Sequence, residues 1–262
     1  MRIALGLEYD GTAYNGWQRQ RVGRGVQEVV DRAVCRVADE TVESFCAGRT
    51  DTGVHASGQV VHFDTTAERS RRSWLLGINS NLPDDVSVHR VEFVSDEFHA
   101  RYSATARSYR YLVLNRLVRS ALFRHRAWWV HAPLDAARMQ AAGRLLIGEH
   151  DFSAFRAAGC QARTATREVT ALDVERRGDW LLLTITANAF LQHMVRNVTG
   201  LLVEIGSGER PPEAAAEVLA SRDRRQAGVA APAHGLTLVA VHYPEACGMP
   251  APTLPPLLPG LP

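Results

Sequence analysis

Residues 45–63 have the sequence FCAGRTDTGVHASGQVVHF, in which a glycine-rich loop leads into an alternating strand. The loop carries Asp51 two residues after Arg49, and its glycines allow sharp turns and the close approach of a substrate. The segment that follows, GQVVHFDT, has the pattern of a strand. Asp51 is therefore either a reactive carboxylate or a polar turn residue, and its surroundings in the chain have to decide between the two.

Strands and helices alternate on both sides of this loop, in two successive rounds. Period-two alternation predicts the strands and helical spacing of apolar residues predicts the helices. In the first half we expect strands at residues 2–10, 58–65 and 86–94, a helix at 26–37, and a short helix from about residue 69 that ends before Pro83. In the second half we expect a strand at 108–114, a helix from about Pro133 to Leu146, a hairpin at 167–187, helices at 194–205 and 211–221, and a closing strand at 236–243.

This repeated order predicts an α+β fold (mixed α/β) made of two ferredoxin-like halves. Hairpin-linked strands favour a largely antiparallel central sheet flanked by helices, and we expect the active-site cleft between the halves. The expected division is an N-terminal half at residues 1–105, which carries the Asp51 loop, a C-terminal half at 106–245, and a proline-rich tail at 246–262.

The composition is that of an ordinary soluble protein, with 46% hydrophobic and 22% charged residues. No apolar run approaches the roughly twenty residues that cross a bilayer, and the N-terminus lacks a signal-peptide pattern. We therefore expect a cytoplasmic protein without a membrane partner. Four cysteines lie far apart, and none of the ten histidines forms a helical metal-binding pair, so no metal site is expected.

All 30 basic residues counted as Lys+Arg are arginines. Between His99 and His131 the chain has seven arginines and no acidic residue, and tyrosines, tryptophans and a phenylalanine are interleaved with them. This pattern fits a strand with a solvated face. It equally fits a surface that binds phosphates and stacks on bases, because guanidinium groups form bidentate contacts to phosphate.

The tripeptide Asp51-Thr52-Gly53 also occurs in aspartic proteases, but the context here is wrong for one. Those enzymes need two carboxylates that share a proton, whereas a cation at Arg49 favours an ionised Asp51. An anionic carboxylate suits nucleophilic attack on an electron-poor carbon. A simple turn with a surface ion pair stays open on the chemistry alone.

The stretch 45–63 closely resembles the signature loop of the TruA-type tRNA pseudouridine synthases. Further blocks resemble the same family in the same order, including EYDGTAYNGWQRQ, NLPDDVSV, FHARYSATARSYRY, GEHDFSAFRA, NAFLQHMVRNVTG and APAHGLTLVAVHYP. Together they extend from about residue 3 to residue 244. Two departures, Thr52 and Ala56, are both small side chains and leave the chemistry intact.

The resemblance implies an isomerase that converts uridine to pseudouridine at positions 38, 39 and 40 of the tRNA anticodon stem-loop, without a cofactor. Asp51 matches the catalytic aspartate, which adds to C1′, adds to C6 or removes the 2′ proton; these three routes stay open. Arg49 matches the arginine that fills the space of the flipped uridine and pairs with the carboxylate. Tyr109 matches the tyrosine that contacts the uracil.

Further positions implied by the resemblance are Arg196, a basic active-site residue, and Leu236, an apolar wall of the uracil pocket. The family acts as a homodimer on the tRNA anticodon arm, and from the arginine-rich segment we expect Arg101, Arg107 and Arg110 to contact phosphates. The competing hypothesis is a non-catalytic RNA-binding protein on the same scaffold, with an aspartic protease as a distant third. The joint presence of Asp51, Arg49 and Tyr109 favours the enzyme.

Overall fold

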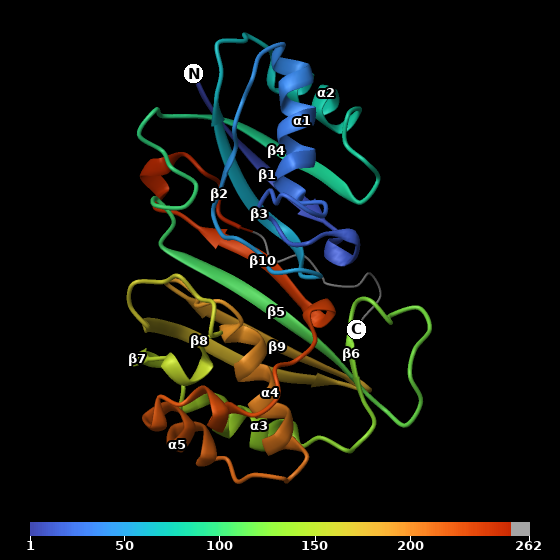
Figure 1. Cartoon of the computed structure of the whole chain (residues 1–262), viewed down its shortest axis with the longest axis vertical. Helices are drawn as coiled ribbons and strands as arrows, with labels where there is room; N and C mark the ends of the chain where they lie inside the picture. The colour runs from blue at the N-terminus through green and yellow to red at the C-terminus, as the bar shows by residue number, and fades with distance from the viewer. Residues whose placement is uncertain (253–262) are drawn as a thin grey trace. The chain divides into compact units, whose positions relative to one another are not determined.

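The computed structural model describes residues 1–252 of the chain (Figure 1). These residues divide into two compact units. The N-terminal unit comprises Met1–Arg107 and the segment that begins at Leu238, and the second unit comprises Ser108–Thr237. The expected division placed the closing strand in the C-terminal half, at residues 106–245. In the structure most of this strand belongs to the N-terminal unit. Residues 253–262 of the predicted tail lie outside the described residues.

The N-terminal unit contains four main strands and two α-helices. Along the chain these elements, with the short strand β2, are β1 (Arg2–Tyr9), α1 (Val26–Ala38), β2 (Phe45–Cys46), β3 (His55–Asp64), α2 (Arg71–Asn79), β4 (Val86–Val94) and most of β10 (Leu236–His242). β1 pairs antiparallel with β3 and β4, and the strand order is β4-β1-β3-β10, with β2 on β3. The order βαββαβ with β1 at the centre is the predicted ferredoxin-like arrangement.

The core of this unit follows from the apolar faces of its elements. The register places Leu5 of β1 between Val61 of β3 and Val91 of β4, and all three are buried. Val30 and Val34 of α1 are fully buried as well, as their helical spacing predicts. α1 and α2 lie against the same face of the sheet (Figure 1).

The second unit is again a sheet covered by helices. Its elements are β5 (Ala106–Asn115), β6 (Trp128–Val130), α3 (Ala136–Arg144), β7 (Gly148–Asp151), β8 (Thr166–Arg177), β9 (Trp180–Ala187), α4 (Met194–Gly206) and α5 (Ala214–Ser221). The strand order is β5-β9-β8-β7; β8 pairs antiparallel with both neighbours, and β6 pairs parallel with β5. α3 packs on β8 and α4 packs beside α3 (Figure 1).

Both boundaries of α3 differ from the prediction. α3 begins at Ala136, not near Pro133, because the carboxylate of Asp135 accepts hydrogen bonds from the backbone amides of Ala137 and Arg138 and caps the helix. The helix also ends at Arg144, so Leu145 and Leu146 lie beyond it. The apolar spacing overestimated this helix at both ends.

The part of the chain that the structure describes contains ten strands and five α-helices, and β1–β3, β1–β4, β2–β3, β7–β8 and β8–β9 all pair antiparallel. This is the predicted mixed α+β fold. Within residues 1–252, none of the helices combines the length and the apolar character needed to cross a bilayer.

Candidate active site

Asp51 lies in the loop between β2 and β3 of the N-terminal unit. Its side chain is half-buried, and that of Arg49 is exposed. A carboxylate in this position keeps access to solvent while the surrounding loop limits its freedom. A buried acid with no access to a substrate would have contradicted a catalytic role, and this placement is compatible with one.

The segment before α1 supports the Asp51 loop from one side. The backbone amide of Trp17 donates to the carbonyl of Thr50 at 3.0 Å, and the amide of Gly53 donates to the carbonyl of Tyr14 at 3.3 Å. Gly16 has φ +92°, and a Cβ atom on it would lie 2.6 Å from the carbonyl oxygen of Thr50. The sequence block EYDGTAYNGW therefore supports the Asp51 loop, because it packs directly against the residues on either side of Asp51.

Buried polar side chains contact the loop from beneath. The hydroxyl of Tyr9 and that of Thr50 are 2.8 Å apart, and Gln59 donates from Nε2 to the carbonyl of Gly48 at 2.7 Å. Gln59 also donates to the Tyr9 hydroxyl at 3.3 Å. Gln59 is fully buried and Tyr9 is 4% exposed. Burial raises the pKa of Tyr9, so its hydroxyl stays neutral at physiological pH.

Arg107 contacts the same loop from a third direction. Its guanidinium donates to the carbonyl of Ala47 from Nε at 3.3 Å and from Nη2 at 3.0 Å. It also donates to the carbonyls of Arg101 at 2.6 Å and Ala104 at 3.2 Å, and the residue is only 8% exposed. Backbone carbonyls accept the hydrogen bonds of this buried guanidinium. Its placement therefore argues against the predicted phosphate contact and for a structural contact with the loop.

The two other arginines predicted to contact phosphates have different environments. Arg101 is exposed, and its guanidinium lies 5.6 Å from the centre of the Tyr102 ring. Arg110, on β5, is half-buried, and its burial and the nearby charge of Arg177 lower its pKa. Of the three, Arg101 presents its charge most openly to solvent.

In the second unit, Tyr109 lies on β5 and is 8% exposed. Its ring packs edge-on against Phe190, with the ring centres 5.1 Å apart. Phe190 comes from the loop before α4 and is half-buried. The ring of Tyr109 is thus oriented by an aromatic neighbour from the block NAFLQHMVRNVTG.

Hydrogen bonds join the first turn of α4, which carries Arg196, to the segment that precedes Leu236. Arg196, in the first turn of α4, donates from Nε to the carbonyl of Ala231 at 2.7 Å, and the amide of Ala231 donates back to the carbonyl of Arg196 at 3.0 Å. The Tyr111 hydroxyl donates to the carbonyl of Pro232 at 2.7 Å. Both contacts position the segment that leads into Leu236, whose side chain is 4% exposed.

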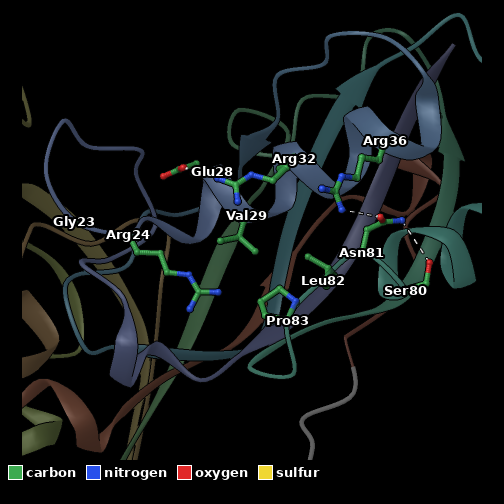
Figure 2. A pocket seen from close by; sticks show the side chains of 10 residues that line it. All are labelled: Gly23, Arg24, Glu28, Val29, Arg32, Arg36, Ser80, Asn81, Leu82 and Pro83. Carbon is green, nitrogen blue, oxygen red and sulfur yellow. Dashed lines mark hydrogen bonds and ion pairs between the residues drawn. The ribbon is translucent and has the colours of Figure 1, made fainter.

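A separate groove of about 490 Å³ lies on the N-terminal unit between α1 and the turn at residues 80–83 (Figure 2). Arg32, which lines it, pairs with Glu28 at 2.8 Å, and Arg36 donates to Oδ1 of Asn81 at 3.2 Å. None of the predicted site residues lines this groove. Within the described residues, no cluster of three or more His, Cys, Asp or Glu side chains is arranged to hold a metal ion.

Comparison with known proteins identifies the family of this chain. A family model described as tRNA pseudouridine synthase matches residues 7–103 and 142–244. The chain belongs to the tRNA pseudouridine synthase family. Proteins named tRNA pseudouridine synthase A are similar over 98% of this chain: the one from Aeromonas hydrophila is 54% identical with 96% of its length covered, and the one from Cronobacter sakazakii is 52% identical with 95% covered.

For this pseudouridine synthase family member, sequence reasoning missed the residues that support the loop. Tyr9 and Gln59 occupy strand positions at which the apolar pattern alone predicts packing. A polar Gln59 between apolar neighbours in GQVV was the available signal, because a buried amide needs hydrogen-bond partners. Phe190 carried no such signal, since its contact with Tyr109 joins segments far apart in the sequence.

Proposed function

We propose that this protein converts uridine to pseudouridine at positions 38, 39 and 40 of the tRNA anticodon stem-loop. Its membership of the tRNA pseudouridine synthase family supports the reaction, and its similarity to proteins named tRNA pseudouridine synthase A supports the choice of substrate. The observation that carries the proposal is the half-buried Asp51 beside an exposed Arg49, on a loop held by hydrogen bonds on several sides.

The reaction breaks the bond between uracil N1 and ribose C1′, rotates the base and forms a bond between C5 and C1′. A proton leaves C5 and a proton is gained at N1, so the product is an isomer of the substrate. No oxidant, reductant or energy source is required. Asp51 adds to C1′, adds to C6 or removes the 2′ proton, and each route needs the ionised carboxylate.

Arg49 is assigned to the opening of the RNA stack. The target atoms are inaccessible in a stacked stem, and unstacking a nucleotide costs about a few kcal/mol. An exposed guanidinium that occupies the vacated space offsets part of this cost, because it can stack on the neighbouring bases and contact phosphates. Its exposure in the loop leaves the side chain available to RNA.

The second unit supplies the remaining proposed contacts to the substrate nucleotide. Tyr109, oriented by Phe190, contacts the uracil and accepts the C5 proton late in the reaction. Arg196 contacts the substrate nucleotide as a basic residue, and Leu236 provides an apolar wall for the base. We propose that the protein works in the cytoplasm as a homodimer on the tRNA anticodon arm, without a cofactor.

Tritium release tests the proposal. Unmodified tRNA that carries C5-tritiated uridine is incubated with the wild type, with Asp51→Asn and with Asp173→Asn, a control at an exposed position on β8. We expect the wild type and Asp173→Asn to release tritium. We expect Asp51→Asn to bind the tRNA but to release no tritium. Release by Asp51→Asn at the wild-type rate would overturn the catalytic assignment. If the wild type binds the tRNA but releases no tritium, the non-catalytic alternative is favoured.

A further inference from the structure

Four aromatic rings form a continuous series on the N-terminal unit. Phe45 of β2 stacks on His62 of β3, with ring centres 5.3 Å apart and an interplanar angle of 26°. His62 lies 4.5 Å from His99, and His99 lies 4.4 Å from Tyr102. We call these four residues the aromatic ladder.

The two ends of the ladder are open to solvent, and of its two middle rings His62 is buried and His99 is half-buried. Tyr102 is 76% exposed and Phe45 is 47% exposed, whereas His62 is 2% exposed. Nδ1 of His62 accepts a hydrogen bond from the backbone amide of Ala100 at 3.2 Å, which orients the ring. The buried, oriented ring of His62 therefore contacts the exposed Phe45 directly and Tyr102 only through His99.

The ladder lies beside the chain segment that leads to Asp51. Phe45 lies two residues before Ala47, whose backbone carbonyl accepts two hydrogen bonds from the Arg107 guanidinium. Arg107 also donates to the carbonyl of Arg101, so one guanidinium joins the residue before Tyr102 to the start of the Asp51 loop. The structure thus couples the position of the ladder to that of the loop.

An arginine lies beside the exposed Tyr102 end of the ladder. The guanidinium of Arg101 lies 5.6 Å from the Tyr102 ring centre. Burial raises the pKa of the Cys46 thiol to about 12, and the positive charges of Arg49 and Arg101 oppose this rise. Arg49, Arg101 and Tyr102 are all exposed.

The histidines of the ladder act as neutral rings at physiological pH. Burial, together with the charges of His99 and Arg2, lowers the pKa of His62 to about 4. Burial and Arg2 also lower the pKa of His99. Uncharged aromatic rings beside an exposed guanidinium suit a nucleobase with its phosphate better than they suit a peptide or a small anion.

We propose that the exposed rings of the aromatic ladder, with Arg101, bind unpaired nucleotides of the RNA substrate by stacking. This inference rests on the proposed function, because it takes RNA as the ligand of this face. It adds a binding surface outside the nucleotide that reacts. Bases next to the target uridine are the expected occupants, since the ladder is continuous with the loop that carries Asp51.

Substitution of Tyr102 tests the ladder. The dissociation constant of unmodified tRNA is measured for Asp51→Asn alone and combined with Tyr102→Ala or Tyr102→Phe. Stacking of a base on an aromatic ring contributes about 1–3 kcal/mol, so Tyr102→Ala should weaken binding about fivefold or more. Tyr102→Phe keeps the ring and should bind within about twofold of the parent.

The chain offers a matched control on the same unit. Phe93 is 43% exposed, and the guanidinium of Arg71 lies 5.5 Å from its ring centre, so Phe93→Ala removes a similar exposed ring beside an arginine. Binding should not change in Phe93→Ala. Equal losses in Tyr102→Ala and Phe93→Ala, or no loss in Tyr102→Ala, would overturn the inference.

Different measurements test the proposed function and the binding role of the ladder. Tritium release by the protein with an intact Asp51 tests the reaction, and the series of dissociation constants tests the ladder without any chemistry. In the catalytically intact background, Tyr102→Ala should raise KM more than it lowers kcat. A lowered kcat with unchanged KM and unchanged affinity would contradict a binding role.

Discussion

The guanidinium of Arg107 donates two hydrogen bonds to the backbone carbonyl of Ala47, from Nη2 at 3.0 Å and from Nε at 3.3 Å. Ala47 lies two residues before Arg49 and four before Asp51. Gln59 donates to the next carbonyl, that of Gly48. The chain that leads to the proposed catalytic carboxylate is therefore held at two consecutive peptide groups by buried side chains, an arrangement that preorganises a site.

Replacement of Arg107 by lysine should therefore impair catalysis more than RNA binding. A lysine ammonium is a compact charge that cannot reproduce a fork with several parallel donors. Loss of hydrogen bonds from a charged, buried donor should cost about 2–3 kcal/mol of unfolding free energy. We expect kcat for tritium release to fall at least tenfold, measured beside urea unfolding of the same protein.

The control for Arg107 is Arg225→Lys. Arg225 is exposed and pairs with Asp223 at 2.7 Å on the surface of the second unit. Surface pairs contribute at most about 1 kcal/mol, so this variant should resemble the wild type. A phosphate-contact role for Arg107 would instead appear as a weaker affinity and a reduced salt dependence, with kcat and stability unchanged.

Gly16→Ala should disable the Asp51 loop by collision. Gly16 has φ +92°, and an added Cβ would lie 2.6 Å from the carbonyl oxygen of Thr50 and 3.2 Å from the carbonyl carbon of Asp51. Both atoms belong to the backbone, so relief requires the loop to move. Because a shift of about 1 Å at a reacting group can cost a hundredfold in rate, we expect kcat to fall by about that factor.

Gly208→Ala separates the collision from backbone strain. Gly208 has φ +87°, close to that of Gly16, but an added Cβ would meet no atom within 4 Å. Both variants should lose stability through the unfavourable conformation, by about 1 kcal/mol or more. Only Gly16→Ala should lose activity, and equal activity in the two variants would show that the loop tolerates the added atom.

Local periodicity was enough to predict the fold. The alternation of Ile3, Leu5 and Leu7 predicted β1, and these residues are fully buried. The spacing from Val26 onward predicted α1. The start of α3 was less predictable, because the cap at Asp135 depends on hydrogen bonds that compete with the apolar pattern.

The candidate site was only partly predictable. Resemblance to the family pointed to Asp51 and Arg49, and the structure puts them on one loop, half-buried and exposed respectively. The role of Arg107 was not predictable, because the same arginine-rich segment also contains the exposed Arg101. Charge and aromatic content describe a segment, whereas burial depends on which strand residue faces the core.

The buried His62 should make the stability of the N-terminal unit depend on pH. Its pKa is lowered to about 4 from an ordinary value of 6.5, with burial as the main cause. The unfolded chain therefore binds more protons at His62 than the folded chain between these values. Its contribution to stability is fully present above pH 6.5 and is lost as the pH falls toward 4.

His62→Asn isolates this contribution, because an asparagine amide oxygen can still accept the hydrogen bond from the amide of Ala100. Urea unfolding is measured for both proteins at several pH values between 4 and 8. One proton of difference corresponds to a slope of at most about 1.4 kcal/mol per pH unit, and the wild type should have the steeper dependence below pH 6.5. Above pH 7 the two stability curves should run parallel. Parallel curves across the whole range would mean that His62 does not titrate differently in the folded and unfolded chains.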